Sequence, residues 1–153
     1  MTAPNRHSVS VAAVITDDQD RVLVVQRRDN GRWEIPGGIL ELHESIHDGV
    51  RREVQEETGA LIEPDQLTGV YKNLKLGVVA LVFRARIIGG ELGPTEESAR
   101  VDWWTRDMVT DQMAETFAIR VTDALDTDQP AIRLHDGVHL IIEQPAAQTP
   151  ARP

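Results

Sequence analysis

Three glutamates in the middle of the sequence stand at spacings that suit metal chemistry. An α-helix turns about 100° per residue, so Glu53, Glu56 and Glu57 would share one sector of a helix about 100° wide. Like charges three or four residues apart destabilise a helix unless something compensates them. Divalent cations such as Mg²⁺ and Mn²⁺ take carboxylate oxygens as ligands and leave other positions to water and substrate phosphates. The pattern therefore predicts a site for Mg²⁺ or Mn²⁺.

The same helix carries an apolar stripe beside these carboxylates. Ile46, Val50 and Val54 recur every four residues and point about 20° to 100° away from Glu53. The carboxylates would then lie at the edge of the buried side of the helix. We expect them to be partly covered by protein and not fully solvated.

A glycine pair precedes the helix and reads as a turn. Pro36 is followed by Gly37 and Gly38, and glycine can adopt positive φ and let the backbone come close to a ligand. We expect both properties here. The backbone carbonyl of Gly37 is a candidate for a further metal ligand.

The spacing of these residues follows a family signature. Five residues separate Gly38 from Glu44, seven more lead to Arg52, and the remaining fixed positions are Glu53, Val54, Glu56, Glu57 and Gly59. This register resembles the signature of the Nudix hydrolases, with every fixed position filled. The last position departs from it, because Ala60 stands where a larger aliphatic residue is usual.

The resemblance implies both a fold and a reaction. The fold would be of the α/β (α+β) class, with a mixed β-sheet sandwiched between α-helices. The reaction would be the attack of water on phosphorus in a nucleoside diphosphate linked to another group X, assisted by Mg²⁺. Glu53, Glu56 and Glu57 would bind the metal, and Arg52 and Glu44 would pair to orient them.

Hydrolysis also needs a base for the attacking water, and in several family members a distant loop supplies it. Glu96 and Glu97 are the candidates here, in the loop before a short strand at 101–104. We favour Glu97, as base and as an additional metal ligand. An acidic loop in solvent with no role in catalysis is an equally good interpretation of the same residues.

Residues for substrate binding are expected on both sides of the glycine turn. Arg27 and Arg28 flank the loop that faces it and are candidates for holding a phosphate or the base, while Glu34 and Ile35 precede Pro36, where family members often line the nucleoside pocket. Aromatic residues able to stack on a base are few, and core packing is expected to use most of them. The candidates are Tyr71, Trp103 and Trp104.

Composition narrows the class of protein. The chain has 153 residues, no cysteine and a net charge of −9. We expect a single domain at 1–143, a Pro/Ala-rich disordered tail at 144–153, and a reducing, cytoplasmic location. The acidic balance argues against nucleic acid or an anionic membrane as a partner, and the apolar segment 9–15 is too short to span a bilayer. A small-molecule nucleotide is the expected partner, and a homodimer is left open.

Apolar periodicity and turn residues predict the order of elements. In chain order we expect a hairpin of strands 7–16 and 21–27, a strand at 33–35, the helix ending at Gly59, an extended segment at 61–67, a pairing of 68–72 with 76–87 across Asn73, the strand at 101–104, a helix at 111–126, and a C-terminal hairpin of 131–134 with 138–142. This last hairpin would extend the family core.

Two questions of function stay open at this point. The rival to an enzyme is a non-catalytic regulator that keeps the fold to sense a nucleotide, although it would have little reason to retain every charge of the cluster. Among substrates, a (d)NTP or modified nucleotide is the default. A pyrophosphatase of ADP-ribose or a sugar nucleotide is the alternative.

Overall fold

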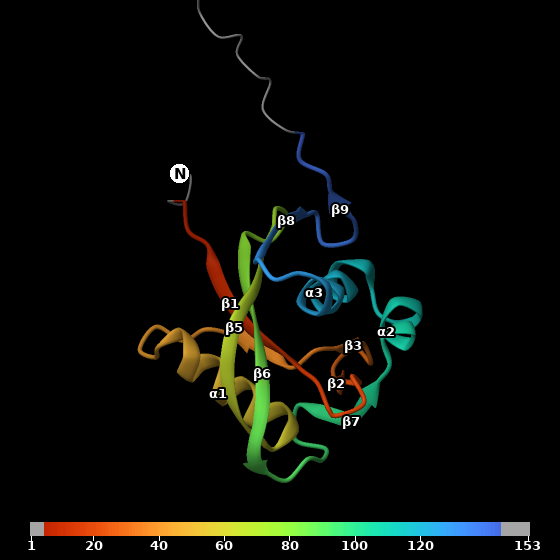
Figure 1. The fold of residues 1–153 in the computed structure, drawn as a ribbon. Coiled ribbons are helices and arrows are strands. Elements are labelled where there is room, and N and C mark those ends of the chain that lie inside the picture. Colours follow the sequence, from red (N-terminus) through yellow and green to blue (C-terminus); the bar gives the residue numbers. More distant parts are fainter. Residues whose placement is uncertain (1–4, 145–153) are drawn as a thin grey trace, which may run out of the picture.

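The computed structural model describes residues 5–144 as two sheets and three helices, shown in Figure 1. In chain order the elements are β1 (Ser8–Ile15), β2 (Val22–Arg27), β3 (Trp33–Glu34), β4 (Gly37–Ile39), α1 (Ile46–Thr58), β5 (Ala60–Asn73), β6 (Val78–Gly90), β7 (Ser98–Trp104), α2 (Arg106–Gln112), α3 (Glu115–Asp126), β8 (Ala131–His135) and β9 (Leu140–Ile141). None of the described helices is both long and apolar enough to cross a membrane.

Six strands form a mixed sheet in the order β4-β1-β6-β5-β8-β9, and β3-β2-β7 form a second sheet. β1 pairs with β6 in parallel along its whole length, from Ser8 opposite Val78 to Ile15 opposite Ala85. β5 and β6 form a long antiparallel pair, which contains the predicted pairing of 68–72 with 76–87 and continues beyond it to Ala60 opposite Gly90. The mixed sheet is therefore confirmed, and its parallel pair places the start of β1 beside the start of β6.

The large sheet separates two hydrophobic cores, because side chains alternate between the faces of a strand. Val11, Ala13 and Ile15 of β1 pack on the side covered by α1. Ala12 and Val14 pack on the side covered by α2 and α3. Figure 1 shows α1 and α3 on opposite sides of the sheet, which confirms the predicted sandwich of helices around it.

The predicted hairpin of 7–16 with 21–27 is wrong, because the two strands enter different sheets. Across the turn only an isolated bridge joins Thr16 to Val22, and Asp20 adopts a positive φ of 58°. Both strands contain runs of buried residues with no polar alternation. Such a strand needs cover on both faces, which a two-stranded ribbon cannot provide.

The predicted helix at 111–126 is also wrong at its start, since α2 ends at Gln112 and α3 begins at Glu115. Met113 between them is extended, with φ −94° and ψ 146°. Met113 and Val121 nevertheless belong to the same core. The four-residue apolar repeat therefore reflects a shared core and not one continuous helix.

The C-terminal hairpin is confirmed and is part of the large sheet. Leu134 pairs with Ile141 and His135 with Leu140. β8 also runs parallel to β5, so the hairpin extends the sheet directly. Of the predicted tail at 144–153, all but Gln144 lies outside the described residues.

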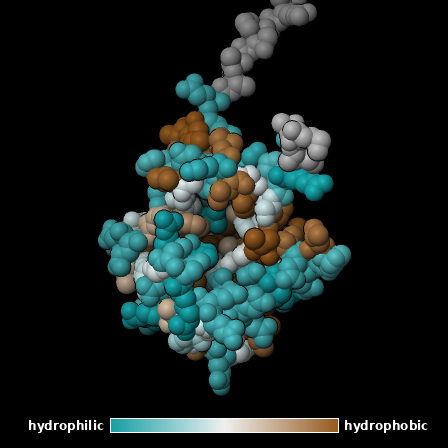
Figure 2. Space-filling model, turned by 180° about the vertical axis from the view of Figure 1, so that it is seen from behind, coloured by the Kyte–Doolittle hydropathy of each residue, from teal (hydrophilic) through white to brown (hydrophobic). Residues whose placement is uncertain are grey.

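Several large apolar side chains of the described chain are exposed, including Leu42 (95%), Ile132 (78%) and Ile142 (90%). On the face drawn in Figure 2, hydrophobic atoms form separate clusters in a mostly hydrophilic surface. The homodimer that the sequence leaves open stays a prediction.

Candidate functional site

Helix α1 carries the predicted metal site and is defined by caps at both ends. Ser45 accepts a hydrogen bond from the backbone N–H of Asp48, which satisfies a free donor of the first turn. Gly59 ends the helix in the left-handed conformation, with φ 80°. Val50 is fully buried as predicted, whereas Ile46 is 42% exposed, so the buried stripe begins one turn later than expected.

Three carboxylates converge beside this helix. Glu53 and Glu57 come from α1, and Glu97 comes from the loop before β7. One oxygen from each lies within 4.8 Å of the others. All three line a cavity of about 520 Å³. The fold thus brings the favoured loop residue to the helix glutamates across 40 residues of sequence.

The electrostatics of the cluster suit a divalent cation. Burial, together with the neighbouring charges of Glu53 and Glu97, raises the pKa of Glu57 to about 8, against the lowering effect of a hydrogen bond from the N–H of Gly37. Burial also raises the pKa of Glu53. Both shifts mean that burial makes the ionised carboxylates costly, despite the hydrogen bond from Arg52 to Glu53. A cation bound to these oxygens would favour their ionised form.

Glu56 lies apart from the three converging carboxylates. Its side chain is 46% exposed and accepts a hydrogen bond from Nη1 of Arg52 at 3.2 Å. The helical sector predicted for Glu53, Glu56 and Glu57 places their Cβ atoms together, but the side chain of Glu56 turns toward solvent and Arg52. Its role as a metal ligand stays a prediction.

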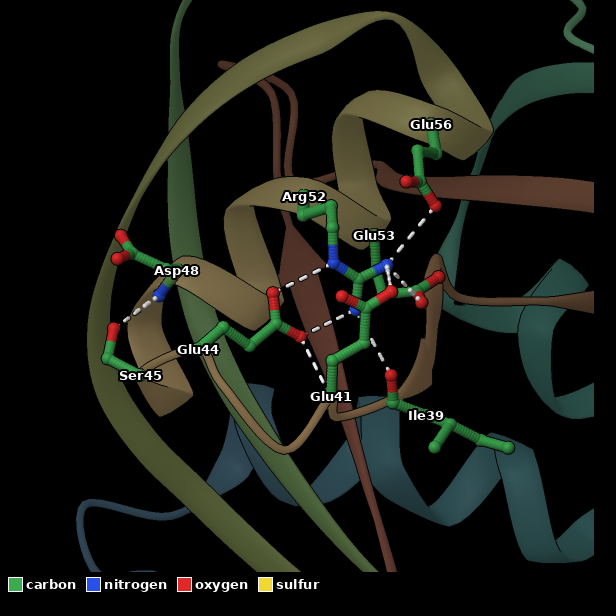
Figure 3. A network of polar contacts seen from close by, with 8 residues as sticks. All are labelled: Ile39, Glu41, Glu44, Ser45, Asp48, Arg52, Glu53 and Glu56. Carbon is green, nitrogen blue, oxygen red and sulfur yellow. Dashed lines mark hydrogen bonds and ion pairs between the residues drawn. The ribbon is translucent and has the colours of Figure 1, made fainter.

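Arg52 is the centre of the polar network drawn in Figure 3. Its guanidinium binds both oxygens of Glu44, with Nε to Oε2 at 2.8 Å and Nη2 to Oε1 at 2.6 Å. This pairing lowers the pKa of Glu44 to about 2. Arg52 also donates to Glu53 at 2.8 Å and to the carbonyl of Ile39 at 3.1 Å. The predicted contact of Arg52 with Glu44 is present. Arg52 thereby connects Glu44, just before α1, with Glu53, whose carboxylate belongs to the cluster.

The glycines before the helix differ from expectation, because neither is among the residues with positive φ. Gly37 and Gly38 lie in β4, paired with Ala12 and Val11. A Cβ on Gly38 would lie 2.4 Å from Oε2 of Glu53. Position 38 therefore requires glycine because the carboxylate of Glu53 lies against its backbone, and not because the backbone adopts a positive φ. The N–H of Gly37 holds Glu57 at 3.1 Å, and a metal contact from its carbonyl stays a prediction.

Arg28 holds the loop that carries Glu97. Its Nε donates to the carbonyl of Thr95 at 2.9 Å, and its backbone N–H donates to the carbonyl of Glu97 at 3.1 Å. The hydroxyl of Thr95 accepts from the N–H groups of Glu97 and Ser98, which closes a tight turn. The structure therefore gives Arg28 a positioning contact, in addition to its place in the wall of the 520 Å³ cavity.

A second cavity of about 220 Å³ adjoins the carboxylates. It shares Arg27, Gly37 and Gly38 with the first cavity, and the predicted residues Glu34 and Ile35 line it. Arg27 makes an ion pair with Asp29 at 2.6 Å and approaches Glu34 to 3.7 Å. Burial raises the pKa of Glu34. All the predicted substrate-binding residues thus lie at one of the two joined cavities.

Most of the aromatic side chains considered for base stacking are core residues. Tyr71 is fully buried and its hydroxyl donates to Asp123 at 2.8 Å. Trp104 is 3% exposed in the same core, and Trp103 packs against the core under α1. Trp103 and Trp104 are therefore unsuited to stacking on a base.

The family model described as "NUDIX domain" matches residues 6–125, most of the chain. The chain belongs to the Nudix hydrolase family. The match contains the carboxylate cluster and ends before β8. The C-terminal hairpin therefore lies outside the matched part of this Nudix hydrolase.

Relatives agree with this membership. A MutT-like protein of Streptomyces ambofaciens is 54% identical over 140 residues, which cover 92% of this chain and 91% of that protein. The 8-oxo-dGDP phosphatase NUDT18 of Mus musculus is 37% identical over 103 residues, which cover 63% of this chain but only 32% of the mouse protein. A crystal structure of an ADP-ribose pyrophosphatase from Streptococcus suis matches with a TM-score of 0.70 at 24% identity, over 83% of this chain and 99% of that one, and shows the fold alone.

Sequence reasoning missed three residues of this Nudix hydrolase that line the second cavity: Phe117, Arg120 and His135. Phe117 and Arg120 fall within the helix expected at 111–126, and His135 falls between the two strands of the expected C-terminal hairpin. Because α3 and β8 are distant in sequence from the signature, no spacing links these residues to it.

Proposed function

We propose that this Nudix hydrolase is a Mg²⁺-dependent or Mn²⁺-dependent pyrophosphohydrolase that cleaves the diphosphate linkage of a nucleoside diphosphate linked to a group X. One observation carries the proposal: oxygens of Glu53, Glu57 and Glu97 converge within 4.8 Å at a cavity, where burial and the charges of Glu53 and Glu97 raise the pKa of Glu57. Buried like charges are costly unless a ligand compensates them.

Glu53 and Glu57 are the residues that would hold the cation. Glu56, on the next position of the helix, is a further candidate that would have to exchange its contact with Arg52 for the metal. A divalent cation held here supplies charge neutralisation for the diphosphate and favours ionisation of water. Arg52 keeps one oxygen of Glu53 fixed at 2.8 Å and is itself held by both oxygens of Glu44.

Glu97 is the proposed general base. Its carboxylate approaches the helix glutamates from a separate loop, so it can accept the proton of the attacking water on a carboxylate oxygen. The contacts of Arg28 with Thr95 and with the backbone of Glu97 hold that loop in place. This arrangement leaves the two helix carboxylates free to hold the cation.

The second cavity is the proposed site for the nucleoside. Arg27 stands between the two cavities, suited to a phosphate oxygen, and Glu34 and Ile35 contact the nucleoside. We take a (d)NTP or modified nucleotide as the substrate class, in keeping with the 8-oxo-dGDP phosphatase among the relatives. ADP-ribose and sugar nucleotides are the alternative. A cytoplasmic location, the absence of nucleic-acid and membrane partners and a single domain at 1–143 remain predictions.

The test is release of phosphate or pyrophosphate from a nucleotide panel with identification of the products. We expect turnover only with Mg²⁺ or Mn²⁺, little with Ca²⁺, and a rate that rises toward alkaline pH, because the ligands must be ionised and water must lose a proton. Equal turnover in excess chelator would refute the metal mechanism. Metal-dependent nucleotide binding without turnover of any panel member would support the regulator instead.

A further inference from the structure

Arg120 is a cation in the second cavity that the proposed reaction does not use. It lies on α3, and its guanidinium carbon is 5.3 Å from the ring centre of Tyr71 and 5.0 Å from that of Phe117. Its Nε is buried and has no hydrogen-bond partner among the described residues. Burial lowers the pKa of Arg120, with an opposing contribution from Glu34. The aromatic rings hold the guanidinium in place, but they leave its donors unsatisfied.

His135 of β8 also lines this cavity and has a second buried donor without a partner among the described residues. Its Nδ1 accepts the backbone N–H of Gly137 at 3.0 Å, so the hydrogen of the neutral ring is on Nε2. Burial and the charge of Arg120 both lower the pKa of His135, which keeps the ring neutral. Nε2 is buried and has no acceptor in the described part of the chain.

Buried donors without acceptors are rare in folded proteins, because each costs about 1–3 kcal/mol. Two of them belong to residues that line one cavity of about 220 Å³, which shares Arg27, Gly37 and Gly38 with the cavity of the carboxylates. The missing partners are hydrogen-bond acceptors. A ligand that occupies the cavity would therefore present acceptor atoms to Arg120 and His135.

The charge of the surroundings decides between two kinds of acceptor. Glu34 lines the same cavity with a raised pKa, and Glu57 lines the adjoining one. A phosphate placed here would add negative charge beside both carboxyl groups. A neutral keto oxygen with an adjacent ring nitrogen avoids this repulsion. These two acceptors also match the two parallel N–H donors of a guanidinium, as when arginine binds O6 and N7 of guanine.

We propose that Arg120 is a specificity-determining residue that donates hydrogen bonds to the keto oxygen of the substrate base. Guanine and hypoxanthine nucleotides would then be preferred over adenine nucleotides, which carry an amino group at that position. His135 supports this selection as a second donor. The inference rests on the proposed function for the location of the base, and it extends that function by naming the class of base.

The first test is kcat/KM for GTP, ITP and ATP with Mg²⁺. A good bidentate contact gives about tenfold to a hundredfold discrimination. We expect the parent to favour GTP and ITP over ATP by this factor, and Arg120→Met to lose most of this preference through a higher KM for GTP and ITP. Arg120→Lys, which retains the charge but not the fork, should recover only part of the preference.

Arg84→Met is the matched control. Arg84 is also half-buried with an unpartnered Nε, but it contacts the carbonyl of Ala124 and does not line the cavity. It should keep the base preference. Thermal unfolding of each variant separates loss of fold from loss of selectivity, and Arg120→Lys keeps the test possible if Arg120→Met does not fold.

A binding experiment tests the inference independently of turnover. Calorimetry with GMP, IMP and AMP in the presence of Ca²⁺ should give the order GMP and IMP before AMP, and Arg120→Met should remove the difference. Equal affinities in the parent overturn the proposal. Equal affinities of IMP and AMP also overturn it, because recognition would then belong to the 2-amino group. An equal loss of affinity for all three nucleotides in Arg120→Met overturns it as well, because Arg120 would then contact the phosphate or ribose. Failure of hydrolysis with the expected binding order would refute the proposed function alone.

Discussion

Replacing Glu57 with glutamine should stabilise the metal-free protein while it abolishes activity. Glu57 is the cluster carboxylate with the largest burial effect, and its pKa rises from 4.5 to about 8. Glutamine keeps the shape and an oxygen that can accept the N–H of Gly37, which lies 3.1 Å from the present carboxylate. The substitution therefore removes a destabilising charge and leaves the contact to β4 in place.

The magnitude and sign follow from linkage between protonation and folding. A folded-state pKa of about 8 against 4.5 in the unfolded chain means that ionisation of Glu57 opposes folding. The penalty is absent below about pH 4.5, grows as the pH rises toward 8, and is complete above it. At about 1.36 kcal/mol per pH unit the upper bound is about 5 kcal/mol. Because solvent enters the cavity and screens the charge, we expect about 2 kcal/mol.

Urea unfolding in excess chelator at pH 5 and pH 9 measures this effect. Glu57→Gln should exceed the parent in free energy of unfolding by about 2 kcal/mol at pH 9 and by much less at pH 5. Saturating Mg²⁺ should stabilise the parent and not the variant. Glu56→Gln is the control, because its exposed carboxylate is paired with Arg52 and its loss should change stability by less than about 0.5 kcal/mol. Parallel pH curves for Glu57→Gln and the parent would refute the reasoning.

Two further pairs of variants test the loop base and the glycines. Glu97→Gln should lower kcat by about 10² to 10⁴ with KM nearly unchanged, whereas Glu96→Gln should lower kcat by less than about threefold. Both variants are measured by steady-state kinetics with saturating Mg²⁺. A small loss of kcat in both would reject the loop base. Gly38→Ala should lower activity and Mg²⁺ affinity at little cost in stability, because the added Cβ would lie 2.4 Å from the flexible carboxylate of Glu53. Gly37→Ala should instead cost about 1–3 kcal/mol of unfolding free energy, because its Cβ would lie 2.4 Å from a backbone oxygen of β1. Urea unfolding with Mg²⁺ titration distinguishes the two, and equal stability losses would contradict this assignment.

The sequence by itself determined the elements whose signals are local. The turn of an α-helix places Glu53 and Glu57 on one side regardless of what surrounds them, and Gly59 ends that helix through its own backbone freedom. The contact of Glu44 with Arg52 was expected from the resemblance to the family, and the structure contains it. Alternating apolar residues in β6 predicted its two buried faces correctly.

Only the tertiary structure decided which distant residues meet. The sequence named Glu97 as a candidate, but its approach to α1 depends on Arg28 holding the loop and on β7 joining β2. The second cavity depends on α3 covering the large sheet to which β8 belongs, which brings Arg120 and His135 to one space. The same applies to β1 and β2. Their apolar runs fit a hairpin, but each strand needs cover on both faces, and the two strands join different sheets. Periodicity records which sides of an element are buried, whereas the partner that buries them is chosen by packing of the whole chain.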